Sequence, residues 1–220
     1  MNEKNNKPYY LVVGVLVAVA VVACLIYLTN APQTPGTKTP EDRPLGNIIE
    51  GNGTVVEETV LTPDFTRPLA FADTVDAEVR TFLQGKFDGL QETLKGNSTD
   101  FNAWVALGTL RKTAGDYAGA AEDWDYIARL YPNSTIPFDN LGDLYMNFIK
   151  NYPQAEANFK ASLVFNPGNI HAYQQLFALY TTYGYKTDTT AAADLVAAGL
   201  AKNPGNATLL QMQQELQTAN

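Results

Sequence analysis

The stretch AWVALGTLRKTAGDYAGAAEDWDYIARLYPN, from Ala103 to Asn133, decides the fold of this chain. It predicts two helices joined by a turn. Small residues at Gly108 and Ala120 are expected to let the two helices approach closely. Trp104 and Trp124 are large enough to fill the gaps between neighbouring helices. The stretch therefore predicts a tightly packed helical hairpin.

The same pattern recurs further along the chain. A proline ends each copy, at Pro132, Pro167 and Pro204, and these prolines are 35 and 37 residues apart. Proline stops a helix because it lacks the backbone N–H donor and clashes with the preceding turn. One hairpin cannot bury its own apolar face, so three hairpins are expected to stack into a curved solenoid with covered ends.

The repeats resemble the tetratricopeptide repeat (TPR) family. The first repeat matches the signature of that family at Trp104, Leu107, Gly108, Gly115, Asp116, Tyr117, Ala120, Trp124 and Pro132. The second matches at Leu141, Gly142, Tyr145, Tyr152, Ala155, Phe159 and Pro167, and the third at Leu176, Tyr180, Gly184, Ala192 and Pro204. The resemblance implies an all-α fold, a short right-handed superhelical solenoid of about three TPR hairpins.

The later repeats depart from the TPR pattern. The second has one extra residue in its inter-helix turn, around residues 146–151. The third has Phe177 in place of the small glycine and Val196 where an aromatic residue is usual. It also has about three extra residues between 185 and 190.

Helices are expected to cover both ends of the solenoid. The first has an apolar stripe at spacings of three and four, with Asp73 or Thr74 as its N-terminal cap. The predicted organisation is a cytoplasmic N-terminus over 1–8, a transmembrane anchor over 9–29, a Pro/Thr/acidic spacer over 30–72, a capping helix over 73–97, TPR repeats over 98–133, 134–168 and 169–205, and a C-terminal capping helix over 206–220.

The membrane anchor is predicted from the uncharged run YYLVVGVLVAVAVVACLIYL, residues 9–28. As a helix this run spans about 30 Å, the thickness of the bilayer core. Lys4 and Lys7 precede it, so the positive-inside rule predicts a single-pass cell membrane protein with its TPR domain outside the cytoplasm. Two alternatives remain open: a lipoprotein whose lipobox-like sequence ends at a lipidated Cys24, and a secreted protein whose signal is cleaved.

The spacer contains six of the 12 prolines of the chain. Such a segment buries too little apolar surface to offset the entropy of ordering, so we expect an extended or disordered spacer. The short apolar runs at 48–49 and 54–56 leave two alternatives open, pairing as strands or docking on the helical domain.

The resemblance also implies a binding site. In TPR proteins the first helix of each repeat lines a concave groove that receives an extended peptide or a helix of a partner protein. The groove positions that the resemblance implies for partner binding are Asn102, Thr109, Lys112, Asp139, Asp143, Asn147, His171, Gln174 and Thr181. Val105 and Met146 also fall on groove positions. The family's Lys/Asn clamp for a C-terminal carboxylate is not expected, because Val105 and Thr109 occupy those positions.

The charged groove residues have alternative interpretations. Asp139 and Asp143 would either meet a basic partner or a cation, or lie on a solvated face with Thr135 as the helix cap. His171 has no second His and no nearby Cys with which to share a metal. Tyr183 and Tyr185 would either anchor a partner or pack against the end helix.

Composition excludes several functions. With 15 Lys+Arg against 23 Asp+Glu, the chain lacks the basic stripe that nucleic-acid binding needs. One His and one Cys exclude paired-His and multi-Cys metal sites, and no cofactor motif or catalytic arrangement is present. The sequence therefore predicts a non-enzymatic, membrane-tethered scaffold for protein–protein interaction. The alternative is a structural subunit or assembly factor of a membrane complex that associates through its transmembrane helix.

Overall fold

The computed structural model describes residues 47–49, 55–57, 60–185 and 189–218. The described residues from 60 to 218 form eight α-helices and one π-helix and no strand, so the predicted all-α fold is confirmed for this part of the chain. The predicted membrane anchor, residues 9–29, and Cys24 lie outside the described residues. Among the described residues, no helix has both the length and the apolar character that a membrane crossing needs. The chain divides into two compact units, Met1–Asp116 and Tyr117–Asn220.

The first unit contains a two-stranded sheet within the predicted spacer. Strands β1 (Asn47–Ile49) and β2 (Val55–Glu57) pair antiparallel, with Ile48 opposite Val56. The alternative of a strand pairing, which the sequence left open, is therefore the one observed here.

Helices α2 (Ala77–Gly96) and α3 (Phe101–Ala114) of the first unit pack against each other. The apolar stripe of α2 places three side chains in the core, Leu83, Phe87 and Leu94. The predicted cap was wrong: α2 begins after Asp76 rather than after Asp73 or Thr74, and the Asp76 side chain makes no capping hydrogen bond.

A left-handed glycine and a buried carboxylate fix the end of α3. Gly115 has a φ of 89°, and a Cβ atom there would lie 2.6 Å from the Cβ atom of Ala72. Both facts require glycine at this position. The buried carboxylate of Asp116 forms ion pairs with Arg67 at 3.2 Å and with Arg111 at 3.5 Å. The segment before α2 is thereby tied to the end of α3.

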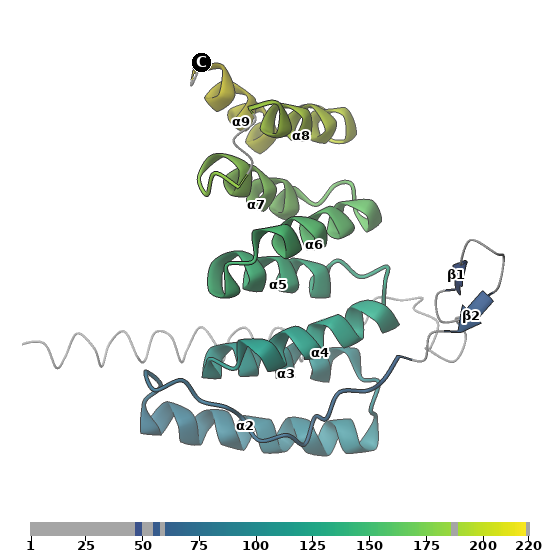
Figure 1. Ribbon diagram of the computed structural model, residues 1–220, viewed down its shortest axis with the longest axis vertical. Coiled ribbons are helices and arrows are strands. Elements are labelled where there is room, and N and C mark those ends of the chain that lie inside the picture. Colours follow the sequence, from purple (N-terminus) through teal and green to yellow (C-terminus); the bar gives the residue numbers. More distant parts are fainter. Residues whose placement is uncertain (1–46, 50–54, 58–59, 186–188, 219–220) are drawn as a thin grey trace, which may run out of the picture. The chain divides into compact units, whose positions relative to one another are not determined.

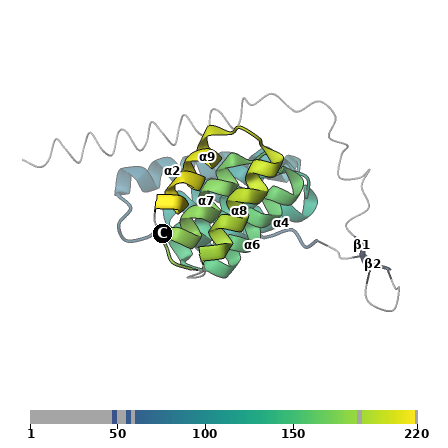
Figure 2. The ribbon, with the colours of Figure 1, turned by 90° about the horizontal axis from the view of Figure 1, so that it is seen from above.

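The second unit consists of consecutive helices, each packed against the next along the chain. They are α4 (Tyr117–Leu130), α5 (Ile136–Leu144), the π-helix η2 (Tyr145–Ile149), α6 (Tyr152–Phe165), α7 (Ile170–Thr181), α8 (Thr189–Lys202) and α9 (Ala207–Thr218). Figure 1 shows the helices of this unit following one another in chain order. Helix α9 also contacts α7, beside which it lies in Figure 2.

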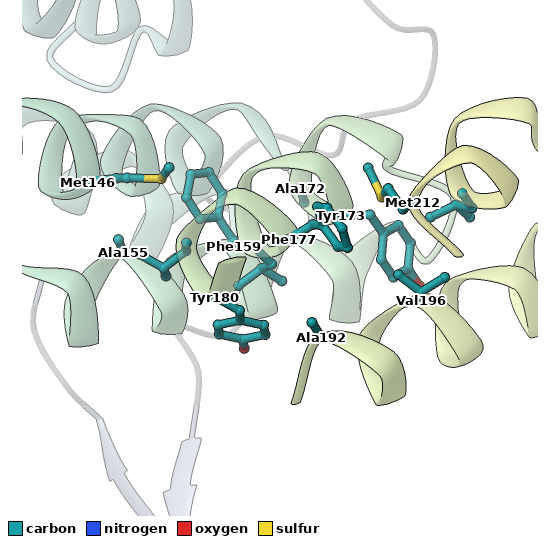
Figure 3. Packing of buried hydrophobic residues seen from close by; sticks show 13 residues of the cluster. Met146, Ala155, Phe159, Ala172, Tyr173, Phe177, Tyr180, Ala192, Val196 and Met212 are labelled. Atoms are coloured by element: carbon teal, nitrogen blue, oxygen red, sulfur yellow. The ribbon is translucent and has the colours of Figure 1, made fainter. Parts of the chain in front are cut away.

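One continuous hydrophobic core runs through the second unit from η2 to α9. Figure 3 shows it with Met146 at one end, Phe159 and Tyr180 in the middle, and Val196 and Met212 at the other end. Phe159 is completely buried. The core thus joins side chains from η2, α6, α7, α8 and α9, which fixes these helices relative to one another.

The extra residue that the sequence predicts in the second repeat falls in a widened helical turn. Residues Tyr145–Ile149 are π-helical, and the backbone N–H of Asn151 reaches the carbonyl oxygen of Tyr145 at 2.8 Å. Lys150 then adopts a left-handed conformation with a φ of 62°. A π-turn accommodates one residue more than an α-turn and changes which side chains point inward. Met146, expected in the groove, is accordingly buried in the core with 2% of its surface exposed.

Candidate binding face

The second unit brings six of the predicted groove residues onto neighbouring elements. They come from α5, η2 and α7 and define what we call the α5–α7 face: Asp139, Asp143, Asn147, His171, Gln174 and Thr181. All six side chains are partly or fully exposed. Two sets of polar contacts, one at each end of the face, join α5 and η2 to α7 or to the segment after it.

Asn169 makes the contacts at the first end. Its amide nitrogen lies 2.9 and 3.1 Å from the two carboxylate oxygens of Asp139 and 2.7 Å from the hydroxyl of Ser162 on α6. The oxygen of the same side chain accepts a hydrogen bond from the backbone N–H of Ala172 at 3.4 Å and so caps α7. One amide therefore joins α5, α6 and α7.

Burial raises the pKa of Asp139 above its ordinary value, although the hydrogen bonds from Ser162 and Asn169 act in the opposite direction. Asp139 lies in the first turn of α5, as expected for an acidic residue near a positive helix end. Thr135 is the N-cap residue of α5, as predicted, but its side chain makes no capping hydrogen bond. The acid is held by the amide of Asn169 instead.

His171 and Asp143 meet beside this junction. The imidazole Nε2 lies 3.5 Å from Oδ2 of Asp143, and the two side chains are 42% and 32% exposed. The interaction with Asp143 raises the pKa of His171, and partial burial opposes it. The second carboxylate oxygen of Asp143, Oδ1, is buried without a hydrogen-bond partner. Asp143 is therefore not a solvated surface acid, and only one of its two carboxylate oxygens has a polar partner.

Aromatic side chains gather at the other end of the face. The Tyr183 hydroxyl donates a hydrogen bond to Oδ1 of Asn147 at 3.1 Å. The Tyr183 ring packs edge-on against Tyr152, with centroids 5.6 Å apart, and the Lys150 ammonium lies 5.5 Å from its centroid. Tyr152 also contacts the ring of Tyr185, and Tyr117 and Phe148 form a separate ring pair. We call these two groups of rings together the aromatic cluster: Tyr117, Phe148, Tyr152, Tyr183 and Tyr185.

The aromatic cluster remains accessible to solvent. Phe148 and Ile149 expose 44% and 39% of their surface, and Tyr183 exposes 36%. The Tyr183 ring packs on Tyr152 of α6, whereas packing against the end helix was the interpretation from the sequence, and 36% of Tyr183 is exposed. That Tyr183 anchors a partner stays a prediction. Aromatic side chains of this kind dominate the energetics of protein interfaces.

The other two residues of the face differ in their free polar groups. Gln174 is exposed on α7. The Thr181 hydroxyl donates to the carbonyl oxygen of Phe177 within its own helix at 2.8 Å. Gln174 therefore offers its full amide to a partner, whereas Thr181 offers mainly its methyl group and one acceptor.

The predicted groove residues of the first unit lie on α3. Asn102, Thr109 and Lys112 are half-buried there. The Thr109 hydroxyl donates to the carbonyl oxygen of Val105 at 2.9 Å, so its donor is used within the helix. Val105, also expected in the groove, is buried with 1% of its surface exposed.

Sequence reasoning missed Asn169 and Ser162. Asn169 immediately precedes the apolar periodicity of α7, and an Asn at that position is a capping signal that could have identified it. No sequence signal indicates that Ser162 meets it. Among the described residues, no group of three or more His, Cys, Asp or Glu is placed to hold a metal ion. Comparison of the sequence with models of known protein families and with curated proteins finds no match.

Proposed function

We propose that this chain is a membrane-tethered module for protein–protein interaction, which binds an extended peptide or a helix of a partner on the α5–α7 face. The observation that carries the proposal is the exposed aromatic cluster next to that face. Its rings supply rigid apolar contact area, and the exposed amide of Gln174 supplies hydrogen-bonding groups.

The repeat pattern of the sequence supports the same proposal. Three TPR-like repeats are expected to stack so that their first helices present one continuous surface. The predicted anchor over residues 9–29 would hold this surface outside the cytoplasm, at a distance from the bilayer set by the spacer. The partner class is thus a protein at or near the outer side of the membrane.

Site-specific photo-cross-linking in native membranes tests the proposal. A photoreactive amino acid replaces Gln174 on the face, and in the control it replaces Gln214, an exposed glutamine of α9. We expect the Gln174 position to give a discrete cross-linked protein that the Gln214 position does not give. Equal labelling from both positions, or none from Gln174, would contradict a binding role for this face.

Deleting residues 1–30 distinguishes binding on the α5–α7 face from association through the predicted transmembrane helix. The shortened chain should still capture the protein that cross-links to Gln174, because the binding face is unchanged. Loss of that protein on deletion, with the helical content retained, would favour a complex assembled through the membrane helix.

A further inference from the structure

His171 is the only histidine of the chain, and it lies where three helices meet. It belongs to the first turn of α7, with Asp143 of α5 at 3.5 Å. On α6 the ring of Phe159 lies edge-on to the imidazole, with centroids 6.2 Å apart. The imidazole thus contacts a carboxylate from one helix and a buried ring from another.

The charged groups around this histidine can be named helix by helix. On α5 they are Asp143 and Asp139, and both raise the pKa of His171. On α6 the charged residues are Glu156 and Lys160, which pair with each other at 2.6 Å. Helices α8 and α9, which also pack on α7, carry the charged residues Asp194, Lys202 and Glu215. The acids of α5 therefore dominate the field at His171.

We propose that His171 and Asp143 form a proton-controlled clasp between α7 and α5, closed when the imidazole is charged and loosened when it is neutral. The charged imidazole presents an N–H donor and a positive charge to Asp143. The neutral ring either turns an unprotonated nitrogen toward the carboxylate or keeps a hydrogen bond to it without the positive charge that strengthens the pair. The clasp acts within the second unit whether or not a partner is bound.

The direction of the pH dependence follows from linkage. The pKa of His171 is raised in the folded chain above its ordinary value of 6.5. The stability that it contributes is present below pH 6.5 and is lost as the pH rises through the folded-state pKa. Asp139 also has a raised pKa, so it acts with the same sign, but from an ordinary value of 3.8 and hence in a more acidic range.

The single histidine makes a direct test possible. The full chain in detergent micelles is labelled with ¹³C at histidine Cε1, which gives one NMR signal to follow between pH 5 and 9. We expect a titration midpoint above 6.5 in the wild type and a clearly lower midpoint in Asp143→Asn. Asp194→Asn, an exposed carboxylate on α8, is the control and should leave the midpoint unchanged.

A wild-type midpoint at or below 6.5, or the same midpoint with and without Asp143, would overturn the clasp. Hydrogen exchange then tests its structural effect. Protection of amides in α5 and α7 should fall between pH 6 and 8, after correction for intrinsic exchange rates, and His171→Gln should abolish that fall. If amide protection falls equally in the wild type and in His171→Gln, the clasp is also overturned. Neither experiment uses a partner, so failure here is distinct from failure of the proposed binding function.

Discussion

Replacing Gly142 by alanine tests the packing of α5 against α6. A Cβ atom at this position would lie 2.5 Å from Cε1 of Phe159 and 2.7 Å from both Cδ1 and Cζ. The Phe159 ring is completely buried, so it has no solvent into which to move. It must shift by about 0.9 Å to restore an ordinary contact of 3.4 Å.

The magnitude follows from two opposing effects. Overpacking of a well-packed core costs about 1–3 kcal/mol. Alanine in place of glycine within a helix returns about 1 kcal/mol. We therefore expect Gly142→Ala to lower the free energy of unfolding of the second unit by up to about 2 kcal/mol, and Gly142→Leu to unfold it.

Gly89→Ala in α2 is the matched control, because apart from the adjacent backbone of its own helix no atom lies within 4 Å of a Cβ at that position. Only the gain in helix propensity remains, and the first unit should become more stable by about 0.5–1 kcal/mol. The difference between the two substitutions isolates the cost of overpacking.

Each unit contains one of the two tryptophans of the chain, Trp104 in α3 and Trp124 in α4. Fluorinated tryptophan therefore reports the urea unfolding of each unit by ¹⁹F NMR. A loss of about 2 kcal/mol should lower the midpoint of the Trp124 signal by roughly 1 M urea. A midpoint for Gly142→Ala above that of the wild type, by as much as Gly89→Ala raises the midpoint of the Trp104 signal, would refute the packing argument. Partial rescue by Phe159→Leu would support it.

Two further predictions concern buried polar contacts of the second unit. Tyr180→Phe removes a 2.6 Å hydrogen bond to the buried carboxylate of Glu156 and should cost about 1–2 kcal/mol, whereas Lys160→Ala, which removes a more exposed partner of the same acid, should cost about 0–1 kcal/mol. The reverse order in urea unfolding would contradict this account. Asn169→Ala removes a cap and leaves a partly buried acid of α5 without its amide, and should cost about 2–4 kcal/mol. Asn151→Ala, which removes only the cap of α6, should cost about 1 kcal/mol, and equal losses would show that the junction at Asn169 adds nothing.

The helical character of the domain could be predicted from the sequence because apolar residues at helical spacing leave little choice of structure. Residue volume was also informative at Gly142, which lies where a helix must approach its neighbour closely. There, however, the glycine makes room for the ring of Phe159, which the signature alone does not specify. A pattern predicts that a small residue is needed, but only the packed structure identifies the atom it accommodates.

The candidate site was less predictable, because its residues were assigned from the positions of groove residues in TPR repeats. That assignment is valid only where the helix is regular. The π-turn at Tyr145–Ile149 breaks that assumption and buries Met146, although the inserted residue was visible in the sequence. The junction made by Asn169 joins residues that are 7 and 30 positions apart. No periodicity encodes such contacts, since they depend on how three helices pack.

The central claim is that the α5–α7 face and its aromatic cluster bind a protein. The affinity of the full chain for the protein that cross-links to Gln174 tests this most directly, with Tyr183→Ala compared with Val164→Ala. Both residues expose apolar surface, 36% and 74% respectively, but Val164 lies on α6 outside the cluster. We predict a loss of affinity of at least about tenfold for Tyr183→Ala and no change for Val164→Ala. Unchanged affinity in Tyr183→Ala, or an equal loss in both variants, would contradict the claim.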